Sequence, residues 1–100
     1  MKKNQANYKR EVVDVISKIA RQNSDSGLLV DFMADILTPH EFENISVRWQ
    51  IVKKLAKYER HEDIASNLSV GIATVTRGSR EMRDQNGGFH KALRFLNGNK

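Results

Sequence analysis

The sequence predicts an all-α fold in one domain that covers residues 1–100. Apolar residues recur at intervals of three or four along most of the chain, as on the buried face of a helix, and little of it alternates as a strand would. The single proline, Pro39, stands where a helix would begin. A hydrophobic fraction of 39% is enough for one small core with a large exposed surface, which association between chains would reduce.

The first helix is expected from about Gln5 to Gln22, and residues 23–27, Asn-Ser-Asp-Ser-Gly, end it. Its apolar stripe consists of Val12, Val15 or Ile16, and Ile19. The segment 1–24 holds six basic and two acidic residues in a chain of net charge +5. This basic N-terminal arm or helix either attracts phosphate groups or is a solvated end of the chain.

Residues 25–58 predict two core helices. The first, from about Leu28 to Ile36, is apolar on more than one side and is expected to be buried. The second begins with Thr38 as N-cap, Pro39 at the first helical position and Glu41 to complete a capping box. Its two apolar stripes consist of Phe42, Ile45, Trp49, Val52 and Ala56, and of Ile51, Leu55 and Tyr58. A helix apolar on two sides needs partners on two sides, which in a chain this short indicates a dimer.

Residues 60–84 predict a helix-turn-helix, in which a short helix with Ile64 and Leu68 is followed by a tight turn and a second helix. Ala65 is small where the two helices approach each other, and Val70 lies beneath the turn. The turn position that usually holds glycine is Ser69, which costs some stability if its φ is positive.

The second helix of this motif is expected from Ile72 to the Asn-Gly-Gly sequence at 86–88, and a short final helix is expected over residues 88–97. The inward stripe of the second helix consists of Ile72, Val75, Ser79 and Met82. Its opposite face carries short polar and guanidinium side chains, which read base edges and bind phosphates: Ala73, Thr74, Thr76, Arg77, Arg80 and Arg83. An amphipathic helical hairpin with a solvated basic face is the alternative.

The sequence gives little indication of disulfides, metal sites, catalytic residues or membrane segments. The chain has no cysteine, which excludes disulfides, thiol catalysis and Cys-based zinc sites. Its three histidines are far apart in sequence, so no metal site is expected, and no pair of carboxylates or Ser-His-Asp set indicates an enzyme. No secretory leader or long apolar run is present, so a cytoplasmic protein without a membrane anchor is expected.

Three motifs occur in order: Leu-Thr-Pro-x-Glu at 37–41, Arg-x-x-Ile-Val at 48–52 and Gly-Ile-Ala-Thr-Val-Thr-Arg-Gly-Ser at 71–79. With them, the chain from about 37 to 96 resembles the tryptophan repressor family. The resemblance implies an intertwined homodimer of six-helix subunits. It also implies a repressor that binds a double-stranded DNA operator with its helix-turn-helix, with L-tryptophan as corepressor and no other cofactor.

The resemblance also implies a ligand site. The indole ring would lie between Arg48 and Arg77, since guanidinium planes stack on aromatic faces. Thr38 and Arg77 would meet the ligand carboxylate, and Gly78 would leave room beside the ring. The ammonium group would be received by main-chain carbonyls near Asp35 and Leu37, at the C-terminal end of a helix. Without the family, Arg48 would be expected to pair with Glu41 or Glu43.

The chain departs from the family at several positions. Glu81 replaces a serine close to the indole, where a carboxylate would accept from the indole N–H, repel the ligand carboxylate or pair with Arg77. Near Tyr58 and Glu59 the chain is one residue shorter. Glu62 replaces an arginine and cannot make its bidentate contact to guanine, although Arg60 is close enough to substitute. His61 and Ala65 replace a glutamine and a lysine.

The DNA-facing residues that the resemblance implies are His61, Ala65, Ile72, Ala73, Thr74, Thr76 and Arg80. A related operator with altered outer bases is expected. The expected function is a homodimeric, sequence-specific DNA-binding repressor with L-tryptophan as corepressor. Because of Glu81, a regulator that is ligand-independent or uses another small effector is the alternative, and a helical protein-interaction module is a more remote one.

Overall fold

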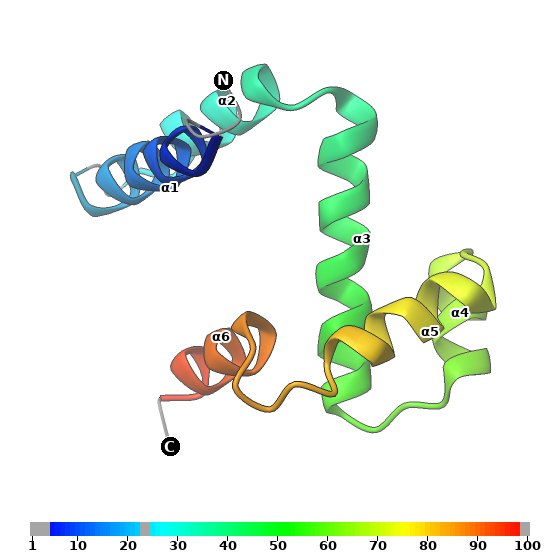
Figure 1. The fold of residues 1–100 in the computed structure, drawn as a ribbon. Coiled ribbons are helices and arrows are strands. Elements are labelled where there is room, and N and C mark those ends of the chain that lie inside the picture. Colours follow the sequence, from blue (N-terminus) through cyan, green and yellow to red (C-terminus); the bar gives the residue numbers. More distant parts are fainter. Residues whose placement is uncertain (1–4, 23–24, 99–100) are drawn as a thin grey trace. The chain divides into compact units, whose positions relative to one another are not determined.

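The computed structural model describes residues 5–22 and 25–98, and these form six helices and no strand (Figure 1). The helices are α1 (Gln5–Gln22), α2 (Gly27–Ile36), α3 (Pro39–Ala56), α4 (His61–Leu68), α5 (Ile72–Glu81) and α6 (Gly88–Leu96). The prediction of an all-α subunit with six helices is therefore confirmed. No helix in the described part of the chain is long and apolar enough to cross a bilayer. The chain divides into two compact units, Met1–Phe42 and Glu43–Lys100.

In the first unit, α1 packs against α2 and has the predicted bounds. The turn between them falls partly outside the described residues, but its end is clear: Gly27 N–H donates to Asp25 Oδ1 at 2.9 Å, next to the first turn of α2. The prediction that α2 is buried is wrong for the single chain. Val30 is 52% exposed and no residue of α2 is buried, because α1 covers only one side of it.

The start of α3 is the predicted capping box. Glu41 N–H donates to Thr38 Oγ1 at 3.1 Å, and Thr38 N–H donates to Glu41 Oε1 at 2.8 Å. These bonds satisfy two N–H groups that a helix leaves without intrahelical acceptors. The hydrogen bonds from the Thr38 main chain and side chain stabilise the ionised carboxylate, and they hold the pKa of Glu41 below its ordinary value.

The second unit has a core of three side chains from three helices. Ile51 of α3, Ile64 of α4 and Val75 of α5 are at most 1% exposed. Half-buried apolar residues surround them, namely Val47, Leu55, Ala65, Leu68 and Val70. Ile64, Leu68 and Val70 therefore occupy the places that the sequence predicts, and Figure 1 shows α4 and α5 beside the C-terminal end of α3.

The turn between α4 and α5 contains a left-handed residue. Ser69 has φ 55° and ψ 46°, and Val70 N–H donates to the Ala65 carbonyl at 3.0 Å. This arrangement satisfies a carbonyl at the end of α4, as glycine usually does at such a position. The structure thus contains two short helices, α4 and α5, joined by a tight turn with a serine at its left-handed position.

Helix α3 also ends in a left-handed residue, and this corrects one prediction. Tyr58 has φ 62° and is 93% exposed, so it does not extend the second apolar stripe of α3. Its N–H donates to the Leu55 carbonyl at 2.9 Å and Glu59 N–H donates to the Lys54 carbonyl at 3.2 Å. Because these bonds close the last turn, the chain leaves the helix axis before Tyr58 reaches the apolar face.

Helix α5 ends at Glu81, five residues before the predicted end at Asn86. The segment between α5 and α6 forms a turn in which Asn86 N–H donates to Asp84 Oδ1 at 3.0 Å and Gly87 N–H donates to the Asp84 carbonyl at 3.0 Å. An aspartate that accepts bonds from the following main chain favours a turn over a helix.

The prediction is also wrong for one residue of the inward apolar stripe of α5. Val75 is buried and Ser79 and Met82 are half-buried, as expected, but Ile72 is 50% exposed. Ile72 is the first residue of α5, beyond the part of the helix that packs on the Ile51 and Ile64 side chains. Its side chain therefore remains on the outer surface of the helix-turn-helix.

Candidate functional site

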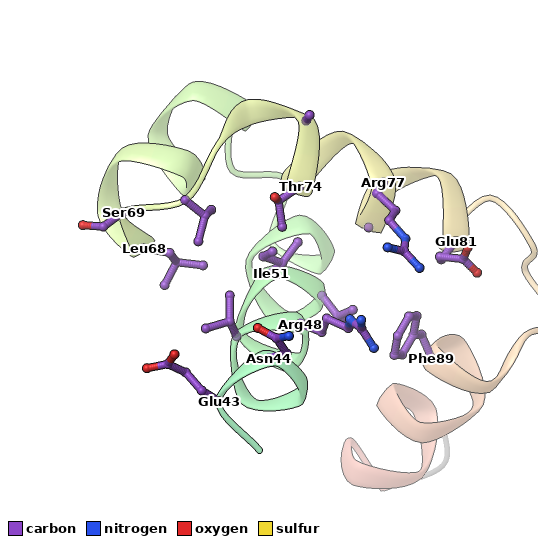
Figure 2. Close-up of a pocket in the computed structure, with 15 residues that line it drawn as sticks. Glu43, Asn44, Arg48, Ile51, Leu68, Ser69, Thr74, Arg77, Glu81 and Phe89 are labelled. Carbon is purple, nitrogen blue, oxygen red and sulfur yellow. The ribbon is translucent and has the colours of Figure 1, made fainter. Parts of the chain in front are cut away.

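The second unit contains a groove of about 890 Å³. It is lined by residues of α3 and α5, by Leu68 at the end of α4, by the turn that precedes α5 and by Phe89 of α6 (Figure 2). Four of the seven residues that the resemblance assigns to a ligand line it: Arg48, Arg77, Gly78 and Glu81. The fold brings these side chains together from helices that are distant in sequence.

The two arginines are held by buried neighbours. Arg48 lies one turn before Ile51 and Val52, which are both 1% exposed, and Arg77 lies two residues after the fully buried Val75. Burial of these anchors fixes the backbone of α3 and α5 and leaves the long arginine side chains at the groove. Figure 2 shows the two guanidinium groups pointing into the space between the helices.

Neither arginine is neutralised within the described residues. The ion pairs there join Arg10 with Asp14, Lys54 with Glu59, and Arg60 with Glu62. The alternative in which Arg48 pairs with Glu41 or Glu43 is therefore not realised, and neither is a pair between Arg77 and Glu81. Both guanidinium groups are exposed and offer their donors to a ligand.

Gly78 has a packing role that the sequence did not indicate. A Cβ atom at this position would lie 2.9 Å from Ile51 Cγ2, closer than side-chain carbons approach each other. The missing side chain lets α5 lie directly against α3, at the edge of the groove. The geometry thus assigns this glycine first to the contact between the two helices.

Glu81 is the last residue of α5, one turn after Arg77. Its side chain is exposed and lies on the groove, as does that of Glu43 on α3. The groove therefore carries two guanidinium groups and two carboxylates. This balance suits a ligand with both signs of charge better than a simple anion.

Phe89 lines the groove and was not predicted as a site residue. Two hydrogen bonds tie α6 to the turn before it: one joins His90 Nε2 to the Met82 carbonyl at 2.7 Å, and in the other Arg94 Nη1 donates to the Gln85 carbonyl at 3.3 Å. The Asn-Gly-Gly sequence signals that the chain turns here, but no local pattern brings Phe89 to a groove with Arg48.

The other three predicted ligand residues, Asp35, Leu37 and Thr38, belong to the first unit, whereas the residues that line the groove belong to the second. Leu37 follows the last residue of α2 in extended conformation, and its N–H donates to the Met33 carbonyl at 3.0 Å. Asp35 is exposed. The Thr38 hydroxyl accepts from Glu41 N–H at 3.1 Å within the capping box.

The predicted DNA-facing residues fall into two groups. Ile72, Ala73, Thr74 and Arg80 are exposed on α5, and two of these, Ala73 and Thr74, also line the groove. The others are half-buried: Ala65 packs against the core, His61 begins α4, and Thr76 Oγ1 donates to the Ile72 carbonyl at 3.0 Å.

The first turn of α4 is acidic. Glu62 and Asp63 lie there, and Arg60 Nη2 is 3.8 Å from Glu62 Oε2 in a pair that is exposed on both sides. Such a surface pair contributes little to stability. No three acidic, histidine or cysteine side chains gather as a metal site in the part of the chain that the structure describes.

The chain is similar to a known protein family and to several of its members. The family described as Trp repressor protein matches residues 10–97. A "Trp operon repressor homolog" of Vibrio parahaemolyticus is 33% identical over 82 residues, which is 81% of this chain and 80% of that protein. The protein of the same description from Vibrio cholerae is 35% identical over 88 residues, 87% of this chain and 82% of its own length. No solved structure matches the chain significantly.

Proposed function

The chain belongs to the Trp repressor family, a family of transcription regulators and not of enzymes, and on this premise we propose that it is a homodimeric, sequence-specific DNA-binding repressor with L-tryptophan as corepressor. The observation that carries the proposal is the groove in which Arg48 and Arg77 meet. Two guanidinium groups without ion-pair partners among the described residues favour an aromatic ligand that carries a carboxylate.

The groove supports the corepressor by its shape and chemistry. A volume of about 890 Å³ lies in the range of small-molecule sites, and an indole ring gains from stacking on guanidinium planes. Phe89 adds an aromatic wall on the side of α6. Aromatic rings pack on each other edge to face or offset, so Phe89 favours a flat aromatic ligand over an aliphatic one.

The homodimer is supported by the first unit. In the single chain Val13 is 57%, Val30 52% and Leu28 49% exposed, although α1 and α2 are amphipathic or apolar. A second copy would cover these side chains and would remove their apolar area from water.

DNA binding is supported by the helix-turn-helix and by the exposed residues of α5. Ile72, Ala73 and Thr74 lie in the first turn of α5, the part of a recognition helix that contacts base edges. Arg80 lies exposed in its last turn and would contact a phosphate. The net charge of +5 favours a polyanionic partner.

The corepressor would act by differential binding. L-tryptophan would bind more tightly to the orientation of the helix-turn-helix that fits two successive major grooves, about 34 Å apart. By linkage, operator DNA would tighten tryptophan binding by the same factor. The ligand contacts α3 and α5 at once, so it holds the recognition helix against the core helix of the same unit.

The proposal is tested by selection of DNA duplexes from a randomised pool with the purified chain, with and without L-tryptophan. We expect a two-fold symmetric sequence to be enriched only with L-tryptophan, and Arg77→Ala to abolish that enrichment. Lys91→Ala, at an exposed position of α6, is the control and keeps it. If no sequence is enriched in either condition, the DNA-binding function is wrong and a protein-interaction module remains.

One observation favours a second candidate, a regulator that binds DNA without tryptophan or with another small effector. The Glu81 carboxylate lines the groove one turn from Arg77, where it would repel a ligand carboxylate. Calorimetric titration of the native chain and of Glu81→Ser with L-tryptophan separates the two functions. Binding by the variant alone would exclude tryptophan as the natural corepressor.

A further inference from the structure

The segment that joins α3 to α4 is strongly basic. Residues 53–60 read Lys-Lys-Leu-Ala-Lys-Tyr-Glu-Arg, with four cations and one carboxylate. Residues 61–84, which contain α4 and α5, hold three arginines and four carboxylates and so have no positive charge to spare. Because attraction to phosphates supplies much of the affinity of a DNA-binding protein, the proposed helix-turn-helix needs cations from a neighbouring segment.

Two lysines of this segment are free to bind an anion. Lys54 is already used, since its Nζ lies 3.7 Å from Glu59 Oε1 and its carbonyl accepts from Glu59 N–H at 3.2 Å. These two contacts hold the connection closed against the end of α3. Lys53 and Lys57, one helical turn apart, are exposed and form no ion pair with a residue that the structure describes.

Tyr58 is placed between these cations at a cost in backbone strain. It has φ 62° and is 93% exposed. Glycine would adopt this left-handed conformation and close the last turn of α3 without strain, whereas a bulky side chain is disfavoured there. Packing does not offset the cost, because almost the whole side chain is exposed. Strain without a structural return is typical of residues that contact a partner.

We propose that Lys53, Lys57 and Tyr58 form a second DNA-contacting surface, which binds the sugar-phosphate backbone beside the base pairs read by α5. This inference rests on the DNA-binding function proposed above. In a helix-turn-helix protein the second helix enters the major groove while the first crosses the backbone. Figure 1 shows that the basic segment leads directly into α4, so it precedes the helix that would cross the backbone.

The acidic first turn of α4 explains why this surface lies before the helix and not on it. Glu62 and Asp63 are exposed there and would repel phosphates. Arg60 is 3.8 Å from Glu62 and offsets one of the two charges. Attraction to the backbone must therefore come from the residues before Arg60, where the two free lysines lie.

The chemistry of the surface favours duplex DNA over a single strand. Proteins that bind single strands stack successive bases on several aromatic rings, whereas residues 53–60 contain one. On a duplex, lysines neutralise phosphates, and a tyrosine contacts phosphate oxygens and sugars. Such contacts add affinity for any flanking sequence and do not change which bases α5 reads.

The test uses two duplexes that carry the sequence enriched by the native full-length chain. One is trimmed to that sequence and the other is extended on each side by one helical turn, about 10 base pairs. Fluorescence anisotropy with L-tryptophan present gives both affinities over a range of salt concentrations. We expect the native chain to bind the extended duplex about tenfold more tightly.

The double variant Lys53→Ala/Lys57→Ala should lose that gain, and its slope of log K against log salt on the extended duplex should fall by about 2 per subunit. Lys91→Ala, at an exposed position of α6, is the control and keeps the gain and the slope. Equal losses by the double variant on the trimmed and extended duplexes would overturn the inference, because the lysines would then not act on flanking phosphates.

Tyr58→Gly separates contact with DNA from support of the fold. It should raise the midpoint of thermal unfolding, because it removes the strain at φ 62°, and yet weaken binding to the extended duplex about fivefold, the effect of one lost hydrogen bond. Unchanged affinity would exclude Tyr58 from the surface. A single strand that competes as well as the extended duplex would also overturn the inference. Failure of the native chain to bind either duplex would instead refute the DNA-binding function itself.

Discussion

The two units of the chain bury their apolar residues in different ways. The second unit closes a core of its own, since Ile51, Ile64 and Val75 are at most 1% exposed in a single chain. The described part of the first unit contains no buried residue, and Val13 and Val30 are more than half exposed. The comparison teaches that α3, α4 and α5 bury their apolar side chains within one chain, whereas α1 and α2 leave theirs exposed, as the proposed dimer requires.

The largest effect is expected in the core of the second unit. Ile64→Ala should lower the free energy of unfolding by about 2–5 kcal/mol, because it leaves a cavity beneath α4. Ile72→Ala is the matched control in the same motif and should cost less than ~1 kcal/mol, because Ile72 is 50% exposed. Urea denaturation measures both, and equal losses would mean that Ile72 is buried in the protein in solution.

A substitution in the first unit should change the strength of the proposed dimer. Val30→Lys places a charge in the surface proposed to be buried between subunits, and it should weaken the dimer by about a hundredfold, or ~3 kcal/mol. Asp31→Lys, at the next exposed position of α2, is the control and should leave the dimer intact. Sedimentation over a range of protein concentrations gives both constants. A dimer unaffected by Val30→Lys would place the interface elsewhere.

A substitution at the contact between α3 and α5 should cause a smaller loss of stability in the second unit. Gly78→Ala should cost about 1–3 kcal/mol, because the new Cβ would overlap Ile51 Cγ2 and push the helices apart. Gly71→Ala is the control, since no atom lies within 4 Å of a Cβ there. Thermal unfolding of both variants checks this. A neutral Gly78→Ala would show that α5 moves away from α3 without cost.

The capping box of α3 gives a pH-dependent effect. The pKa of Glu41 is lowered in the folded chain, so its contribution to stability is complete above its ordinary pKa of 4.5 and is lost as the pH falls through the lowered value. The stability advantage of the native chain over Glu41→Gln should therefore shrink as the pH falls below 4.5. Urea midpoints over a pH series measure it. An advantage that does not change with pH would contradict the cap.

The smallest effect is expected at the turn of the helix-turn-helix. Ser69→Gly should stabilise the chain by up to ~1 kcal/mol, since φ is 55° at this position and glycine adopts positive φ without strain. Ser66→Gly, inside α4, should destabilise it by a similar amount. Thermal unfolding of the two variants would measure these opposite changes in stability. If both variants lose stability, the Ser69 side chain contributes more than its backbone strain costs.

The sequence predicts best the features that depend on neighbouring residues. The capping box at Thr38 and Glu41, the bounds of α1 and the tight turn at Ser69 follow from local chemistry. The same reasoning fails where a competing local bond ends a helix, as Asp84 does after α5 and as the bond between Tyr58 and Leu55 does after α3. Helical periodicity contains no signal for these bonds.

The candidate site was predictable in part. The resemblance supplies Arg48 and Arg77, and the fold brings both to one groove. Phe89 was not predicted, because its place depends on the turn at residues 82–87 and on the bond from His90 to the Met82 carbonyl. The packing role of Gly78 was not predicted either, because it depends on the distance between two helices.

The hydrogen bond between Thr76 and the Ile72 carbonyl would restrict which base edges α5 recognises in the proposed complex with DNA. The Thr76 hydroxyl hydrogen is already committed to its own helix, at 3.0 Å. Toward a base edge the residue presents a methyl group and oxygen lone pairs, so it matches the methyl of thymine or the amino groups of adenine and cytosine. Guanine O6 and N7 are acceptors and would require Thr76 to give up its intrahelical bond. In the proposed complex with DNA, Thr76 would therefore act as an acceptor, whereas the arginines of the same helix would act as donors.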